Sequence, residues 1–221
     1  MSRPFRYTFI LVLVALGACL AAVSGWRYAR ASAPVSGPIV LISIDALRAD
    51  RLSAYGYRRR TTPAIDTLAA DGVTFERAYA HVPQTFPSHA ALLTGRLPFE
   101  TGVRDGVGPP LAASERLLPE MLRDRGFATA GIVSSFLLRK ETGIGQGFTL
   151  FDADLPPSDT GQPLPRSGAD SEKIAEHWLD SIGTSRAFLF LHLAEPHEPR
   201  QVASGSADVP APELTPYDAA V

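Results

Sequence analysis

Two continuous apolar runs constrain the fold more than any other feature of the sequence. One is Ile39 to Ile44 (IVLISI) and the other is Ala187 to Leu193 (AFLFLHL). Runs of this length without polar alternation are typical of strands buried on both faces of a parallel sheet. Segments with helical spacing alternate with them along the chain. The sequence therefore predicts an α/β fold with a mixed, mainly parallel sheet flanked by helices.

The helices between and after these runs are marked by capping residues, helical apolar spacing and closing glycines. They are expected at 62–71, 88–94, 117–125 and 172–182. A further strand is expected at 128–134, and a strand or extended segment at 73–80. The Pro-, Ser-, Asp- and Gly-rich stretch 152–171 predicts a long surface loop.

Residues 1–31 form a separate segment of different composition. Thr8 to Trp26 is uncharged and mostly apolar, with arginines on both sides. It has about the length that a helix needs to cross a hydrocarbon core of ~30 Å. We expect an N-terminal transmembrane or signal helix with its apolar span at 8–26, rather than a buried core helix. An uncleaved signal anchor, a signal peptide cleaved near Ala29 to Ala31 and a lipoprotein-like signal at Cys19 all remain open.

Composition adds a linker and excludes several kinds of partner. Residues 32–38 (SAPVSGP) are small residues and prolines, which predicts a short flexible linker. The formal net charge of −2 gives no electrostatic argument for nucleic acid. Because Cys19 is the only cysteine, one chain can form neither a disulfide nor a cysteine-based zinc site.

Three residues stand where chemistry is expected. Asp45 follows the first apolar run and His197 follows the second, and sites in α/β sheets form beyond the carboxyl ends of strands. Thr85 precedes the helix expected at 88–94, where backbone N–H groups favour negative charge. A carboxylate suits a divalent cation, which would lower the pKa of a neighbouring hydroxyl. Taken singly, each residue also has a purely structural interpretation. Asp45 could cap a turn, Thr85 could cap a helix, and His197 could be an ordinary exposed loop histidine.

The stretches around these residues together resemble the amino-terminal part of the sulfatase family, within the alkaline phosphatase superfamily. The matching blocks are IVLISIDALRADRLSAYGY, TPAIDTLAADGVTFERAYA and TFPSHAALLTGRLPFETGVRD, in this order. The resemblance is strong from Pro38 to Asp105 and looser as far as EPHEPR. It implies that 39–221 is the amino-terminal portion of a catalytic domain that acts, with a metal ion, on sulfate or phosphate esters.

The resemblance also implies roles for the three residues. By position, Asp45 matches a metal-binding aspartate, Thr85 the nucleophile that also contacts the metal, and His197 a histidine that helps bind the ester or its leaving group. The implied ion is Ca²⁺ or Zn²⁺, with Mn²⁺ as a third option. The implied substrate is a small-molecule, lipid or glycan ester, and the domain is expected to be periplasmic or extracellular, anchored to a membrane or secreted.

Departures from the family pattern affect the chemistry. Sulfatases proper carry Cys or Ser at the nucleophile position, followed by x-Pro-x-Arg, and oxidise it to formylglycine. Here the segment is TFPSH, with His89 in place of the arginine. A threonine cannot give that aldehyde, because its β-carbon bears a methyl group. This segment is more similar to nucleotide pyrophosphatase/phosphodiesterases, in which an unmodified threonine attacks phosphorus. Many sulfatases also have a second aspartate where this chain has Ala46.

Three functional hypotheses follow. The first is a sulfatase-like hydrolase that uses Thr85 as its nucleophile. The second is a phospho-group transferase of the same superfamily that acts on a lipid or glycan. The third is an inactive, truncated pseudoenzyme. The family's remaining metal ligands, an aspartate followed by His or Asn near a glycine, are not found in the sequence. We therefore expect a fragment that lacks part of the metal site.

Overall fold

The computed structural model describes residues 15–22, 25, 37–106, 108–159, 161–197 and 218. The chain divides into two units, Met1–Gly37 and Pro38–Val221. In the first unit, residues 15–22 are helical and exposed. Among the described residues, no helix has the length and apolar character needed to cross a membrane. Much of the predicted span 8–26 lies outside the described residues.

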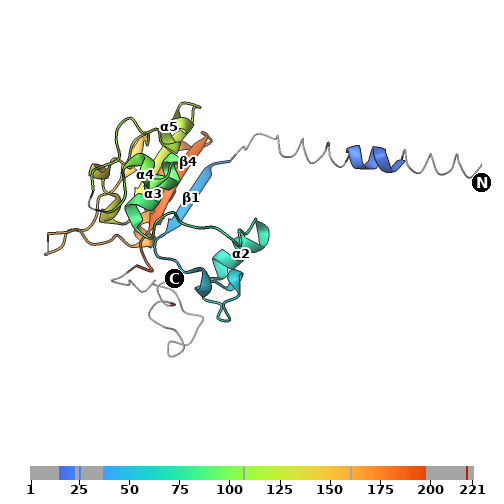
Figure 1. Ribbon diagram of the computed structural model, residues 1–221, viewed down its shortest axis with the longest axis horizontal. Coiled ribbons are helices and arrows are strands. Elements are labelled where there is room, and N and C mark those ends of the chain that lie inside the picture. The colour runs from blue at the N-terminus through green and yellow to red at the C-terminus, as the bar shows by residue number, and fades with distance from the viewer. Residues whose placement is uncertain are drawn as a thin grey trace, which may run out of the picture. The chain divides into compact units, whose positions relative to one another are not determined.

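A four-stranded parallel sheet forms the centre of the second unit, in the order β1-β4-β2-β3 (Figure 1). The strands are β1 (Ile39–Ile44), β2 (Ala128–Val133), β3 (Leu150–Asp152) and β4 (Ala187–Leu193). β4 pairs with β1 on one side and β2 on the other. The predicted α/β class with a parallel sheet is confirmed, and every described strand pair is parallel.

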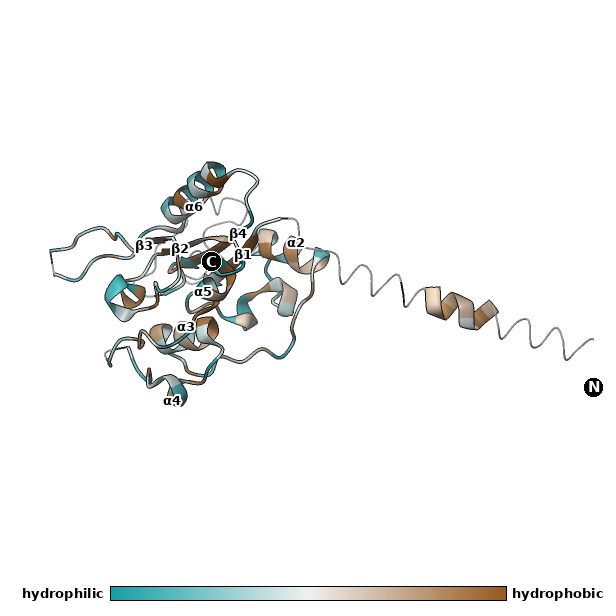
Figure 2. Ribbon diagram, turned by 90° about the horizontal axis from the view of Figure 1, so that it is seen from above, coloured by the Kyte–Doolittle hydropathy of each residue, from teal (hydrophilic) through white to brown (hydrophobic). Residues whose placement is uncertain are grey.

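Helices cover both faces of this sheet (Figure 2). On one side lie α3 (Thr85–Thr94), α4 (Pro98–Thr101) and α5 (Leu118–Arg123), and on the other lies α6 (Gly168–Ile182). Phe188 and Phe190 belong to the core beneath α3, whereas Leu189 and Leu191 pack with Trp178 of α6. Because successive strand residues point to opposite faces, a strand covered on both sides must be apolar throughout.

β1 differs from the prediction because it is not buried on both faces. β4 is buried over almost its whole length, whereas Val40 and Ile42 of β1 are 43% and 52% exposed. β1 has a strand on one side only, at the edge of the described sheet. The apolar run identifies a strand, but the run itself carries no information on which neighbours cover it.

Several predicted boundaries also move. The helix expected at 62–71 is α2 (Pro63–Asp71), the segment 73–80 contains no strand, and α3 begins at Thr85 rather than at residue 88. The loop expected at 152–171 is wrong at both ends, since β3 includes Asp152 and α6 begins at Gly168. Short 3₁₀ helices that were not predicted lie at Ala49–Arg51, Ser53–Tyr55, Phe136–Leu138 and Lys140–Thr142.

Arg166 explains why the predicted loop ends in a buried structure. Its guanidinium donates to Asp152 Oδ1 at 2.5 Å, to the Val133 carbonyl at 3.0 Å and to Ser171 Oγ at 3.0 Å. A buried charge is tolerated when it is paired and hydrogen-bonded in this way. These contacts hold the first turn of α6 against the carboxyl ends of β2 and β3, close to the end of β4.

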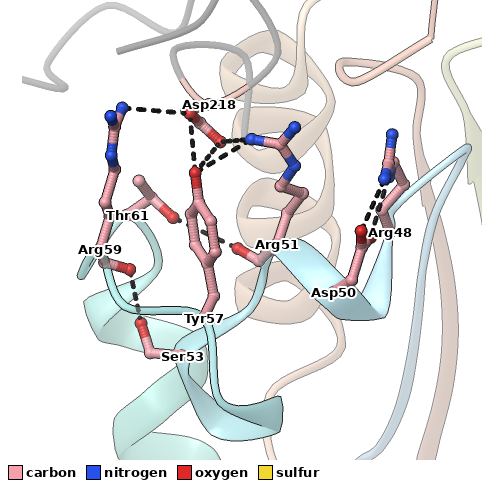
Figure 3. A network of polar contacts seen from close by, with 8 residues as sticks. All are labelled: Arg48, Asp50, Arg51, Ser53, Tyr57, Arg59, Thr61 and Asp218. Atoms are coloured by element: carbon pink, nitrogen blue, oxygen red, sulfur yellow. Dashed lines mark hydrogen bonds and ion pairs between the residues drawn. The ribbon is translucent and has the colours of Figure 1, made fainter. Parts of the chain in front are cut away.

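A second polar network ties residue 218 to the segment after β1 (Figure 3). The Asp218 carboxylate accepts from Tyr57 Oη at 3.1 and 3.0 Å, and it forms ion pairs with Arg51 at 3.4 Å and Arg59 at 3.8 Å. The Asp218 side chain is completely buried. Its charge is therefore compensated by groups of the 51–59 segment, which begins shortly after Asp45.

Candidate active site

Asp45 and Thr85 meet at the carboxyl end of β1. Asp45 continues the sheet by one residue, because its N–H donates to the Leu193 carbonyl at 2.8 Å. The hydroxyl of Thr85 donates to Asp45 Oδ2 at 2.9 Å. Two side chains that are forty positions apart in the sequence are thus joined by a direct hydrogen bond.

Thr85 is the first residue of α3, not its cap. Gln84 occupies the N-cap position in an extended conformation and makes no side-chain capping bond. The first backbone N–H groups of a helix have no partner within it, and together with the helix dipole they favour negative charge. Thr85 is nearly buried, so its hydroxyl lies where an anion is stabilised by the fold.

A pocket of about 360 Å³ opens over this pair. It is lined by Asp45, Ala46, Leu47, Val82, Pro83, Gln84, Thr85, Ser88, His89 and His197. The structure therefore brings all three sequence-predicted residues to one pocket. His197 is exposed and lies four residues beyond the end of β4.

The environment of Asp45 favours its ionised form. Burial raises the pKa of Asp45, but the contacts of its carboxylate with His192 and Thr85 outweigh that effect. The resulting pKa lies below the ordinary value of 3.8. Asp45 is therefore a carboxylate at neutral pH, as an acceptor from Thr85 or a cation ligand must be.

Ala46 has a left-handed backbone, with φ of 56°. Among the described residues it is the only non-glycine with positive φ. Such a conformation is costly for a side chain with a β-carbon and is often found at functional sites. It turns the chain sharply after β1, so that Leu47 as well as Asp45 lines the pocket.

His89 connects α3 to β1 beneath the pocket. Its Nδ1 donates to the Thr85 carbonyl at 2.6 Å, and its Nε2 lies 2.7 Å from Ser43 Oγ. Burial and the neighbouring His192 lower the pKa of His89 to about 4, so the ring is neutral. Because Nδ1 carries the proton, Nε2 accepts from Ser43. His89 thus fixes Thr85 relative to the strand that carries Asp45.

His192 lies on β4 beside the same carboxylate. It is completely buried, and its Nε2 is 3.6 Å from Asp45 Oδ2. Its ring meets the ring of His89 edge to face, with centroids 5.0 Å apart. Neither His192 nor Ser43 was predicted from the sequence as a site residue. The signal was available, since His192 is the only polar residue in the run AFLFLHL.

Glu195 anchors the loop that carries His197. Its Oε1 accepts from the backbone N–H of Gly168, the first residue of α6. A β-carbon on Gly168 would lie only 2.6 Å from Glu195 Oε1, so a larger residue at this position would require the end of the Glu195 side chain to shift. A carboxylate at a helix N-terminus is favourable, and here it joins the His197 loop to a rigid element.

The oxygen atoms of Asp45 and Thr85 suit a hard divalent cation as partial ligands. Calcium takes six to eight oxygen ligands and zinc usually four ligands. Within the described residues, no group of three or more His, Cys, Asp or Glu side chains is arranged to hold a metal ion. The pair is therefore compatible with part of a metal site and too small to be a complete one.

The chain is similar in sequence to known sulfatases. The model of the Sulfatase family matches residues 38–218. N-acetylgalactosamine-6-sulfatase of Sus scrofa is 37% identical over 141 residues, which cover 58% of this chain and 25% of that protein. Arylsulfatase A of Homo sapiens is 44% identical over 96 residues, covering 41% and 19%. The chain spans about a quarter or less of these curated relatives.

Solved structures share the fold at lower identity. A protein in complex with its substrate D-glucosamine-2-N,6-O-disulfate matches with a TM-score of 0.63 and 21% identity, over 75% of this chain and 35% of that chain. The phosphonate monoester hydrolase of Agrobacterium radiobacter gives 0.60 and 23%, over 73% and 41%.

The C-terminal periplasmic domain of EcEptC from Escherichia coli, in complex with Zn, gives a TM-score of 0.56 and 19% identity, over 83% of this chain and 55% of that chain. These three likenesses show the fold alone. The family match extends over most of the chain, from β1 to the residue that closes the Asp218 network. The chain belongs to the sulfatase family.

Proposed function

We propose that this chain is the amino-terminal part of a metal-dependent hydrolase of sulfate or phosphate esters, with Thr85 as its nucleophile. The observation that carries the proposal is the 2.9 Å hydrogen bond from Thr85 Oγ1 to Asp45 Oδ2. It lies at the N-terminus of α3, in the pocket that His197 also lines. A hydroxyl held by a carboxylate at a helix N-terminus is placed both to lose its proton and to face an anion.

The reaction is proposed to proceed in two displacements. Thr85 Oγ bonds to sulfur or phosphorus as the bond to the substrate's bridging oxygen breaks. His197 is proposed to contact that oxygen and to help protonate the leaving alcohol. Water then attacks the sulfo- or phospho-threonine, which releases inorganic sulfate or phosphate and restores the hydroxyl. Asp45 accepts a hydrogen bond from Thr85 before the attack and after the restoration.

Asp45 and Thr85 are proposed to hold a divalent ion, either Ca²⁺ or Zn²⁺, with Mn²⁺ as a third option. The donor set supports this, since both are oxygen ligands and the Asp45 carboxylate is ionised. A bound ion would lower the pKa of the Thr85 hydroxyl and offset the charge of the ester. The other ligands would come from water and from residues beyond those that the structure describes.

The chemistry of the nucleophile, rather than the names of the relatives, guides our proposal for the substrate class. The curated relatives are named as sulfatases, and one fold neighbour is a phosphonate monoester hydrolase. Thr85 cannot form formylglycine, which leaves direct attack by a hydroxyl. We propose a sulfate or phosphate ester of a small molecule, lipid or glycan. Assaying 4-nitrophenyl sulfate and 4-nitrophenyl phosphate side by side decides between the two.

Replacing Thr85 tests the nucleophile. Thr85→Val keeps the shape but removes the hydroxyl, and turnover should fall at least a thousandfold, on the order of a lost catalytic group. Thr85→Ser keeps the hydroxyl and should retain measurable turnover. Ser88→Ala is the matched control, because Ser88 lines the same pocket one turn further along α3. Turnover by Thr85→Val close to that of the unmodified protein would rule out the assignment.

The products separate hydrolysis from its alternatives. A hydrolase releases one inorganic sulfate or phosphate for every ester consumed. A transferase consumes a lipid or glycan donor without matching release of the inorganic anion. A pseudoenzyme gives neither product and, after dialysis against Zn²⁺ or Ca²⁺, retains no stoichiometric metal.

We also propose that residues 1–31 export the catalytic domain 39–221 and anchor it in the membrane, with 32–38 as the linker. The support is the uncharged apolar composition of 8–26. Fractionation of cells tests this proposal, together with protease treatment of intact spheroplasts. A soluble cytoplasmic protein of unaltered mass would contradict it. The mass of the mature N-terminus distinguishes an uncleaved anchor, cleavage near residue 31 and lipidation of Cys19.

A further inference from the structure

His192 is a buried polar side chain for which the proposed reaction has no use. It is the sixth residue of β4 and has no exposed surface. Neither of its ring nitrogens has a hydrogen-bond partner in the described part of the chain. Buried polar atoms without partners are rare in native proteins and call for an explanation.

The sheet register places this side chain in the layer beneath the pocket. His192 is opposite Ser43 of β1, and parallel partners point to the same face of a sheet. Ser43 contacts His89 of α3, and His89 contacts His192 edge to face. Asp45, two residues beyond Ser43, completes the layer. Three elements thus supply polar groups to the space around a single carboxylate: Ser43 from β1, His192 from β4, and both Thr85 and His89 from α3.

The contact between His192 and Asp45 is specific in its atoms. Nε2 of His192 lies 3.6 Å from Oδ2, the same oxygen that accepts from Thr85. This distance is somewhat longer than a hydrogen bond, and a small movement of either ring or carboxylate closes it. A neutral imidazole carries one proton, and a buried N–H is stabilised only where an acceptor faces it. The carboxylate faces Nε2.

We propose that His192 is a positioning residue that carries its proton on Nε2 and holds Asp45 Oδ2 toward Thr85. The inference rests on the proposed function of Asp45 and Thr85 and adds the group that sets the orientation of the carboxylate. With Oδ2 held between Thr85 and His192, Oδ1 is the oxygen available to a cation. Outer groups that orient a ligand in this way commonly change metal affinity or activity tenfold or more when removed.

A histidine that only fills space in the core would give different results. In that case no contact would favour the tautomer with the proton on Nε2. An aromatic ring of similar shape could then replace the histidine without loss of function. His192→Phe keeps the ring and removes the donor. His192→Gln places an amide N–H about as far along the side chain as Nε2. The two variants therefore separate hydrogen bonding from packing.

The tautomer is tested first, in the metal-free protein and without any assay of activity. Nitrogen–proton correlation spectra of the histidine rings should show His192 with its proton on Nε2. His89, whose Nδ1 donates to the Thr85 carbonyl, should show the opposite tautomer and serves as the internal reference. A His192 ring with its proton on Nδ1 alone would overturn the proposal. This readout is independent of whether Thr85 is the nucleophile.

The variants are then compared in the full chain by zinc titration, by kcat and by thermal unfolding. His192→Phe should bind Zn²⁺ at least tenfold more weakly and lose at least tenfold in kcat, with a similar KM and melting temperature. His192→Gln should remain within threefold of the unmodified protein. His177→Gln, a change of an exposed histidine on α6, is the control and should alter nothing.

Two outcomes contradict the proposal. Equal effects of the Phe and Gln variants would assign His192 to packing, as would unchanged zinc affinity in His192→Phe. If the proposed function itself fails, Thr85→Val retains turnover while the tautomer of His192 still reports on its contact with Asp45. The two failures are therefore distinguishable.

Discussion

Acid should destabilise this protein through one buried histidine, His89. Burial, with His192 beside it, lowers the pKa of His89 from 6.5 to about 4 in the folded state, although Asp45 and the Thr85 carbonyl oppose the shift. In the unfolded chain, His89 therefore binds a proton as the pH falls below 6.5, whereas in the folded chain it stays neutral until the pH approaches about 4. Folding therefore loses stability as the pH falls through this window. At about 1.4 kcal/mol per pH unit, the loss approaches roughly 3 kcal/mol.

His89→Gln removes the titration and keeps an amide that can donate and accept. The free energy of unfolding of both proteins is measured by urea titration at several pH values between 4 and 7, with chelator present. His89→Gln should be the less stable protein at pH 7, and the difference should shrink by about 3 kcal/mol toward pH 4. A difference that stays constant over this range would contradict this prediction, because His89 would then titrate alike in both states.

Three further predictions concern residues around the site. Arg166→Met should lower the free energy of unfolding, measured with urea, by about 1–3 kcal/mol, because the partly buried Asp152 carboxylate and the Val133 carbonyl lose their donor. Arg166→Lys should cost less, and a loss below about 1 kcal/mol from Arg166→Met would contradict the role given to these contacts. Ala46→Gly should gain up to about 1 kcal/mol by removing the cost of positive φ, and Ala46→Asp should tighten binding in a zinc titration by adding a carboxylate where many family members have one. Asp218→Asn should destabilise the protein by about 1–3 kcal/mol, since it removes the charge that faces Arg51 and Arg59.

The location of the candidate site could be predicted because of the sheet. A continuous apolar run that ends abruptly at Asp45 identifies a strand and the edge at which its carboxyl end lies. In a parallel sheet, the residues after β4 reach that same edge, which is why His197 shares a pocket with Asp45. The roles of these residues stay predictions.

The start of α3 could not be read from the sequence. Gln84 is an N-cap without a side-chain capping bond, so the usual signal for a helix start is missing. Pro87 is the third residue of α3 and lies in its first turn, where proline is tolerated. The consequence is chemical, because Thr85 belongs to the first turn of the helix rather than to the loop before it.

The buried polar groups were missed for a different reason. Arg166 lies in a stretch whose composition is that of a surface loop, and it is buried because Asp152, Val133 and Ser171 converge on it. That convergence joins β2, β3 and α6, which are separated in sequence. Hydrogen-bond partners that are distant in the sequence are determined by tertiary structure, so they cannot be predicted from local composition.

The proposed function requires that Thr85 becomes covalently sulfated or phosphorylated during turnover. The most direct measurement quenches the reacting full-length protein in acid and analyses its tryptic peptides by mass spectrometry. Cleavage after Arg77 and Arg96 gives the peptide 78–96, which contains Thr85 together with Ser88 and Thr94. We expect one sulfo or phospho group on this peptide, with fragmentation that places it on Thr85. An unmodified peptide from a protein trapped at steady state, or a group placed on Ser88 or Thr94, would contradict it.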